Sequence, residues 1–246
     1  MRRSLGLIAA VTTAVSLSAA CSGGGGGGSA SPTPSGTPTP SGTQPPGGSF
    51  TPLKVGNVWH YDIVPSAGAT TTKDVSVTAL EDIGGQKAGT SGFKIHTAES
   101  NGTSQDEWHV DQGSVVLRER KKDYDTMSAL KSDTYYNPSK LYIDQTSAHR
   151  ALNATWQESY VDSSTDASTG TTTDTTHVIT WTVLSTNDSV VTGAGTFPCL
   201  KVHRVSSVSG TTGADKIYWF AQGVGKVKED DPGVQTETLT SYTIVP

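Results

Sequence analysis

Residues 57–244 contain many short runs in which Val, Ile, Thr, Tyr or Trp alternate with polar residues, and this alternation constrains the fold most strongly. A two-residue period is typical of β-strands that bury one face, and the Gly, Asn, Asp and Ser residues between the runs indicate turns. No stretch of the sequence keeps a long helical period of 3.6 residues. We therefore expect an all-β antiparallel meander of about 10–11 strands, near residues 57–64, 71–81, 92–100, 104–111, 114–121, 154–161, 176–186, 197–207, 214–221, 225–230 and 234–244.

Two sets of these strands resemble each other. Segment 56–59 opens the first set and segment 153–156 opens the second. Three further matches follow in the same order, and the last of them places Trp108 opposite Tyr218: 75–79 with 179–183, 88–96 with 194–203, and 108–113 with 218–223. Matches that keep their order along the chain predict an internal duplication.

The duplication divides the domain at 50–246 into halves near 50–122 and 150–246, joined by a connection at 123–149. We expect the duplicated meander to form a strongly curved sheet or an incomplete barrel. The connection has the weakest strand pattern, and we expect a short helix in it, near 127–131 or 138–142. Its apolar side chains form a candidate lid over the concave side of the sheet: Met127, Leu130, Tyr135, Tyr136, Leu141 and Tyr142.

The phase of each strand predicts which side chains share a face. The matched pairs Lys94 with Lys201 and His96 with His203 fall on the outer face, so we expect these histidines to be solvated. Four tryptophans fall at the inward phase, where they either fill the core or line a cavity for an apolar or sugar ligand: Trp59, Trp108, Trp156 and Trp181.

The first 20 residues have the pattern of a secretory signal. Arg2 and Arg3 precede an apolar stretch at 5–17, and small residues lead up to Cys21. This pattern resembles a bacterial lipoprotein signal, although Ser18 stands where that family prefers Leu. The resemblance implies cleavage before Cys21 and a covalent lipid on its thiol, with no other cofactor. An ordinary signal followed by a chance cysteine is the alternative.

Residues 21–49 predict a disordered tether behind that anchor. The stretch from 22 to 49 has no charged or aromatic residue and is rich in Gly, Ser, Thr and Pro, so it cannot bury enough apolar surface to fold. Two or more acyl chains would hold such a protein stably on a bilayer. The resemblance implies the cell envelope as location: the outer membrane in a Gram-negative cell, otherwise the outer face of the plasma membrane.

Composition excludes several partners. The net charge is −5, and removal of Arg2 and Arg3 with the signal shifts it to about −7, which argues against nucleic acid and anionic lipid as ligands of the domain.

Once Cys21 is lipidated, Cys199 has no internal disulfide partner and is expected to be a small buried hydrophobe. We expect a monomer.

Catalytic and metal-binding patterns are weak. Glu107, His109 and Asp111 are spaced for one face of a strand, which suits either a metal site or, as we prefer, a solvated face. The acidic segment 229–233 has a turn signature, with weak Ca²⁺ binding as the alternative. The sequence contains no nucleophile elbow, zinc-protease motif or phosphate-binding loop, so we assign no catalytic or metal-binding residue.

Both ends of the domain resemble the TapB-like group of bacterial envelope proteins. Residues 52–61 are similar to the opening of that group, and residues 219–227 and 237–242 are similar to its closing hairpin. The resemblance implies an envelope lipoprotein and supplies no catalytic residue. At the level of fold alone, a curved sheet on a lipid anchor is similar to the half-barrels of the LolA and LolB type.

These observations predict a non-enzymatic envelope lipoprotein. Its concave sheet would bind an apolar small molecule or an envelope protein. A structural or adhesive surface protein is the alternative, and a hydrolase with a spatially assembled site is the least favoured.

Overall fold

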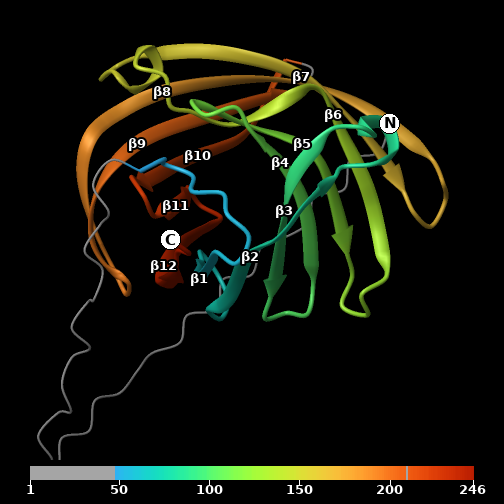
Figure 1. Ribbon diagram of the computed structural model, residues 1–246, viewed down its shortest axis with the longest axis horizontal. Helices are drawn as coiled ribbons and strands as arrows, with labels where there is room; N and C mark the ends of the chain where they lie inside the picture. The colour runs from blue at the N-terminus through green and yellow to red at the C-terminus, as the bar shows by residue number, and fades with distance from the viewer. Residues whose placement is uncertain (1–47, 209) are drawn as a thin grey trace, which may run out of the picture. The chain divides into compact units, whose positions relative to one another are not determined.

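The computed structural model describes residues 48–208 and 210–246, which form one antiparallel β-barrel (Figure 1). The signal, Cys21 and nearly all of the tether lie outside the described residues. Each strand pairs with its neighbours in the sequence, and the first pairs with the last, so the meander closes on itself. The expected all-β meander is confirmed, whereas an incomplete barrel or half-barrel is wrong.

The barrel has twelve strands, of which β8 is the longest with 21 residues. Their bounds are β1 Val58–Pro65, β2 Thr71–Asp82, β3 Ser91–Glu99, β4 Ser104–Asp111, β5 Val115–Tyr124, β6 Leu130–Asp144, β7 Thr155–Asp166, β8 Thr172–Thr192, β9 Gly195–Val208, β10 Thr211–Ala221, β11 Gly225–Asp231 and β12 Gln235–Thr243. Two one-turn 3₁₀ helices, η1 (Gly85–Lys87) and η2 (Ala148–Arg150), lie in connections.

The strand missing from the sequence prediction is β6. It occupies most of the connection at 123–149, so a helix at 127–131 or 138–142 is wrong. Pro138 obscured the strand because proline cannot donate a ladder hydrogen bond. The barrel accommodates it in an irregular stretch: Arg118 of β5 pairs with Lys140 of β6, but Arg120 already pairs with Tyr135.

This strand also corrects the lid hypothesis. Leu130, Tyr135, Tyr136, Leu141 and Tyr142 belong to a wall strand that is hydrogen-bonded to β5 and, in its first half, to β7. Met127 sits in the preceding turn and is 82% exposed. The segment is therefore part of the barrel wall, and no part of it lies across an opening as a lid.

The two ends of the barrel differ. The hairpins β1–β2, β3–β4, β5–β6, β7–β8, β9–β10 and β11–β12 all turn at one end, which we call the hairpin end. At the other end the chain enters through residues 49–53. Phe50 and Leu53 pack there against Val116, Ile143 and Phe220, and the Ser49 carbonyl accepts a hydrogen bond from the Gly223 N–H. This entering segment closes the second end, which we call the plugged end.

The β8–β9 hairpin continues beyond the plugged end and folds back along the outside. Its Val190 and Phe197 belong to one buried apolar cluster with Trp219 and Val227. A Cβ on Gly193 would lie 3.3 Å from the Cα of Thr240, which places the hairpin turn directly on β12. Figure 1 shows the hairpin curving around β11 and β12. The outer face of β10–β12 is therefore covered, whereas that of β3–β5 is not covered by this hairpin.

The halves β1–β6 and β7–β12 match at their indole sites, in a register that differs from the predicted one. Trp108 of β4 pairs with Lys94 and Arg120, and Trp219 of β10 pairs with Lys201 and Lys228. The pairing register shifts directly after both tryptophans. The structural counterpart of Trp108 is thus Trp219, and the predicted match with Tyr218 is wrong.

Candidate functional site

A cavity of about 370 Å³ occupies the interior of the barrel. Barrels of about eight strands are just filled by their inward side chains, so twelve strands leave room. A second hollow shares Thr97, Glu99 and Gln105 with the cavity and continues to the ends of β5, β6 and β7 at Tyr124, Ser132 and Asp166. The interior therefore opens toward the hairpin end, and its other side is bounded by Thr51, Pro52 and Leu53 of the plug.

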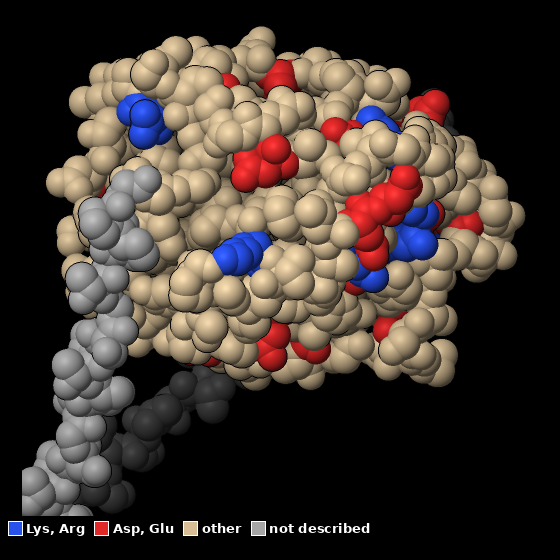
Figure 2. Space-filling model, viewed as in Figure 1, with Lys and Arg blue, Asp and Glu red and all other residues tan. Residues whose placement is uncertain are grey.

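The lining combines apolar and charged side chains. Its charged members come from nine different strands: Lys73, Glu99, Glu107, Arg118, Lys121, Lys140, Arg204, Lys216, Lys226, Glu229 and Glu237. Its main apolar members are Trp59, Tyr61, Val75, Ile95, Leu141, Tyr142, Trp181, Tyr218 and Phe220. On the face of the molecule drawn in Figure 2, most of the surface is uncharged, and acidic and basic side chains gather mainly on the right of the view.

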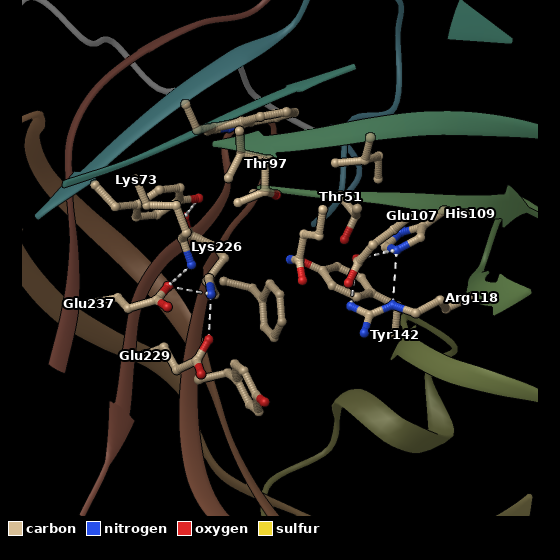
Figure 3. A pocket seen from close by; sticks show the side chains of 18 of the residues that line it. Thr51, Lys73, Thr97, Glu107, His109, Arg118, Tyr142, Lys226, Glu229 and Glu237 are labelled. Carbon is tan, nitrogen blue, oxygen red and sulfur yellow. Dashed lines mark hydrogen bonds and ion pairs between the residues drawn. The ribbon is translucent and has the colours of Figure 1, made fainter. Parts of the chain in front are cut away.

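One group of charges, the Lys226 cluster, is formed by Lys73, Lys216, Lys226, Glu229 and Glu237 (Figure 3). The Lys226 ammonium contacts both carboxylates and lies 2.8 Å from Glu237 Oε2. Lys73 also pairs with Glu237, and Lys216 lies 2.7 Å from Glu229. Every charge of this cluster has an opposite charge in contact.

The neighbouring charges set the protonation of the cluster. Burial opposes ionisation of Glu229 and Glu237, but Lys226 and the other lysines outweigh it and lower the pKa of both carboxyls. Burial likewise opposes the charge of Lys226, yet Glu229 and Glu237 raise its pKa well above the usual 10.5. Lys226, Glu229 and Glu237 are therefore ionised near neutral pH, whereas burial and the charge of Lys226 lower the pKa of Lys73.

A second group, the Arg118 cluster, consists of Glu107, His109, Arg118, Lys140 and Arg204. Arg118 Nη2 lies 2.7 Å from Glu107 Oε2, and His109 Nε2 lies 3.0 Å from the same oxygen. Figure 3 shows these three side chains together beside Tyr142, away from the Lys226 cluster. His109 Nδ1 is buried without a hydrogen-bond partner in the described part of the chain.

Electrostatics at the Arg118 cluster favour one carboxylate and a neutral imidazole. Burial opposes the charge of Glu107, but Arg118 and His109 hold its pKa at about 2. Burial lowers the pKa of His109 more than Glu107 raises it, so the ring is neutral at neutral pH. Glu107 neutralises Arg118 and leaves Lys140 and Arg204 without a contacting carboxylate.

The cationic groups of Lys140 and Arg204 lie against aromatic rings. Within residues 48–208 and 210–246 neither side chain forms an ion pair. Lys140 Nζ lies 5.3 Å from the Tyr136 ring centroid and 5.4 Å from that of Tyr160. The Arg204 guanidinium lies 5.7 Å from the Trp181 ring centroid. Burial, reinforced by Arg118 and Arg204, lowers the pKa of Lys140 well below its usual 10.5.

The nearby carboxylate of Glu158 does not fill this gap. Its two oxygens accept hydrogen bonds from the Leu141 backbone N–H at 2.8 Å and from Trp181 Nε1 at 3.1 Å. Burial raises the pKa of Glu158 more than these hydrogen bonds and the charges of Arg204 and Lys140 lower it, so its carboxyl is less readily ionised than usual. The Arg118 cluster therefore has an excess of positive charge inside an acidic protein.

Three of the four predicted inward tryptophans do face the interior. Trp59 and Trp181 line the cavity, and Trp59 Nε1 donates a hydrogen bond to the Val224 carbonyl at 2.6 Å. Trp156 stacks against Trp181 and against His149, with centroids 6.1 and 4.1 Å apart. They serve as the apolar wall beside the charged clusters.

Trp108 is the exception and faces outward. Its Nε1 donates to Glu81 at 3.0 Å, and the cationic groups of Lys94, Arg120 and Lys122 lie over its ring. Glu107 and His109, which were expected on the solvated face, point into the cavity instead. The phase was misjudged because the interior of this barrel is charged, which reverses the rule that apolar residues face inward.

The predicted metal candidates are not brought together. Glu107 and His109 lie inside, whereas Asp111 is exposed and accepts a hydrogen bond from the Gly113 N–H. Within the described residues, no group of three or more His, Cys, Asp or Glu side chains is placed to hold a metal ion. In the acidic segment 229–233, the expected turn is confined to Pro232 and Gly233, where the Val234 N–H is bonded to the Asp231 carbonyl, whereas residues 229–231 end β11.

The outer-face histidines and Cys199 lie where they were expected. His96 pairs with Asp106 at 2.8 Å and His203 with Asp215 at 2.5 Å, both outside the cavity. Cys199 is 1% exposed and free, and burial raises the pKa of its thiol to about 12. These residues belong to the wall rather than to the site.

Sequence reasoning missed Arg118, Lys140, Arg204 and Lys226 as inward residues. A signal was present in two of their strands, because charged residues follow one another without interruption at 118–123 and 228–231 and so occupy both phases of the strand. A strand whose inner face packs an apolar core cannot accept that pattern. Charges at both phases therefore indicated a polar interior.

Comparisons with known proteins give a distant likeness of fold. No family model matches the chain, and no curated protein matches it, so the TapB-like resemblance depends on the quoted residues alone. A presumed exported protein with a YmcC-like fold from Bacteroides fragilis is 12% identical, with a TM-score of 0.45, covering 80% of this chain and 100% of that one. A presumed lipoprotein from Parabacteroides distasonis is 14% identical, with a TM-score of 0.44, covering 80% and 99%.

These likenesses are too distant to transfer a function or a residue.

No helix of the described residues has the length and apolar character needed to cross a membrane.

Proposed function

We propose that this chain is a lipid-anchored protein of the bacterial cell envelope that binds a small amphipathic molecule inside its barrel and catalyses no reaction. The observation that carries the proposal is the interior cavity of about 370 Å³, which has both an apolar wall and buried charges. Small-molecule pockets typically measure about 300–1,000 Å³ and combine an apolar lining with a few polar groups that orient the ligand. The original expectation of a purely apolar ligand does not fit so many charged side chains.

The architecture supports a one-ended binding site. The plug at residues 49–53 closes one end, and the hollow past Thr97, Glu99 and Gln105 leads out at the hairpin end. Ser49, the last residue of the expected tether, lies at the plugged end. A tether that begins at a lipidated Cys21 would thus leave the barrel at its closed end, and the mouth stays free for ligand.

The composition of the cavity supports binding over hydrolysis. Within residues 48–208 and 210–246, the lining includes no serine or cysteine that could act as a nucleophile. His109 contacts Glu107, but that carboxylate is also paired with Arg118. The arrangement holds fixed charges in place and, among the described residues, places no serine or cysteine nucleophile beside a base.

Mass spectrometry of the purified full chain tests the binding proposal. We expect small molecules to be released on denaturation of the native protein and to be lost from the variant Thr97→Trp, which fills the cavity from β3. Ala98→Trp on the outer phase of the same strand is the matched control. If neither the native chain nor the control carries a molecule, and no added amphiphile binds, the binding proposal fails and a structural or adhesive role replaces it.

Membrane attachment is tested separately with Cys21→Ala. We expect the native chain to fractionate with membranes and to be processed to a smaller, lipidated form. The variant should be released from the membrane fraction and keep its signal or be cut elsewhere. A variant that remains attached at the native size would refute lipidation at this residue.

A further inference from the structure

We propose that the ligand of the barrel is an organic anion whose carboxylate, phosphate or sulfonate group binds between Arg118, Lys140 and Arg204, with its apolar body on the neighbouring aromatic wall. This inference rests on the proposed binding function and names the chemistry of the ligand. The site follows from the charge imbalance between the two clusters of the cavity.

Most of the cations that line the cavity contact a carboxylate. Lys73, Lys216 and Lys226 contact Glu229 or Glu237, and Lys121 is 2.9 Å from Asp123. Arg118 is satisfied by Glu107 at 2.7 Å. Among the cations that line the cavity, the two without a carboxylate partner in the described part of the chain are therefore Lys140 and Arg204.

Lys140 and Arg204 are costly to keep away from water without a counter-charge. Arg204 is 8% exposed, and Lys140 is half-buried against the rings of Tyr136 and Tyr160. A cation that is withdrawn from water without a counter-charge loses several kcal/mol of hydration energy, and buried charges in proteins are usually paired. An anion that enters the cavity supplies the missing charge and favours the ammonium form of Lys140.

The N–H groups of Arg118, Lys140 and Arg204 suit an anionic group. Arginine binds the planar oxygens of a carboxylate or phosphate through a fork of N–H groups, and lysine adds a point charge. Arg118 and Lys140 are paired neighbours on the adjacent strands β5 and β6, and Arg204 comes from β9, so the cations approach the cavity from two parts of the wall. Such convergence suits an anionic group better than a flat surface patch would.

Aromatic rings beside these cations provide a surface for the apolar part of the ligand. Trp181, beside Arg204, has its ring centroid 6.2 Å from that of Tyr218, which lies 5.9 Å from that of Phe220. All three residues line the cavity. These rings offer a continuous apolar wall next to the cations, so the ligand has an apolar body attached to its charge.

Two fluorescent probes with the same aromatic body test the inference on the purified full chain. The probe 1-anilinonaphthalene-8-sulfonate carries a sulfonate, and N-phenyl-1-naphthylamine lacks it. We expect the sulfonate to bind at least about tenfold more tightly, since a charge-assisted contact is worth a factor of this order. We expect Lys140→Met and Arg204→Met each to remove that preference and leave the affinity for the neutral probe unchanged.

The controls separate this inference from the function beneath it. Lys201→Met removes a cation from the outer face of β9, where Lys201 lies over Trp219, and should change neither affinity. If both probes bind equally well and Thr97→Trp expels both, the cavity binds ligands but the anion site is refuted. If neither probe binds the native chain, the proposed function fails together with the inference.

Discussion

Arg118 and Lys226 occupy matching positions in the two halves of the barrel, yet they have opposite surroundings. Each faces the residue that follows the outward tryptophan of the preceding strand, His109 in one half and Phe220 in the other. Lys226 contacts two carboxylates, Glu229 and Glu237, whereas Arg118 contacts Glu107 alone and has Lys140 and Arg204 in its vicinity.

The contrast separates a structural role from a binding role. Charges that neutralise one another in a buried cluster need no counter-charge from a ligand. Removing one of them leaves its partner buried without an opposite charge. Charges of one sign that remain uncompensated are costly until something enters the cavity. The same replacement of a cation by an apolar residue should therefore have opposite consequences in the two clusters.

The largest effect is expected from Lys226→Met. The variant leaves Glu229 and Glu237 facing each other in the cavity with only Lys216 and Lys73 to offset them. Removal of one partner of a buried ion pair typically costs about 3–5 kcal/mol of folding free energy. Urea unfolding of the full chain measures the loss, and a change under about 1 kcal/mol would mean that the cluster is more hydrated than its burial indicates.

Protonation of Glu107 in acid should lower the free energy of unfolding by somewhat less than Lys226→Met does. Its folded pKa of about 2 lies below the usual 4.5, so the stabilisation is fully present above about pH 4.5 and disappears as the pH falls toward 2. The shift corresponds to an order of about 3 kcal/mol. Glu107→Gln should flatten the acid side of the stability curve in this window, and exposed Asp111→Asn should leave it unchanged.

Much of the fold could be predicted from the sequence because most strands alternate cleanly. The eleven expected strands all occur, and their bounds differ mainly where β7, β8 and β9 run longer than the apolar alternation indicated. The missing strand β6 contains Pro138 and charged residues, a pattern that is typical of loops. Whether a meander closes cannot be derived from local alternation, since closure depends on the pairing of β1 with β12 across the whole chain.

The site could not be predicted because its phase depends on that closure. In an incomplete barrel, Glu107 and His109 would be sensibly placed in solvent and Trp108 in the core. In a closed barrel with a spacious interior, inward charges can pair with one another inside the cavity, as Lys226 of β11 does with Glu237 of the adjacent strand β12. The outward tryptophans are then covered by the side chains of neighbouring lysines and arginines.

Lys140→Met should have the opposite effect, because here the loss of a cation should stabilise the protein. Replacing a half-buried lysine that has no carboxylate partner by a side chain of similar size removes the cost of charging it away from water and should add about 1–2 kcal/mol near pH 7. The advantage should shrink as the pH rises toward 10.5, since burial lowers the pKa of Lys140 and the folded chain therefore releases this proton at a lower pH than the unfolded chain. Thermal unfolding between pH 7 and 10 measures both trends, and a destabilised variant would contradict the charge excess.

The smallest effect concerns the two outward tryptophans, where the halves should behave alike. Trp108 Nε1 donates to Glu81 at 3.0 Å, and Trp219 Nε1 donates to Asp188 at 2.7 Å, while cations cover both rings. Phenylalanine keeps most of the apolar contact but loses the hydrogen bond, so Trp108→Phe and Trp219→Phe should each cost about 1 kcal/mol. Equal losses would support descent of the halves from one duplicated unit. A much larger loss at Trp219 would show instead that packing under the β8–β9 hairpin outweighs the shared polar contacts, and that the likeness of the two sites is confined to their geometry.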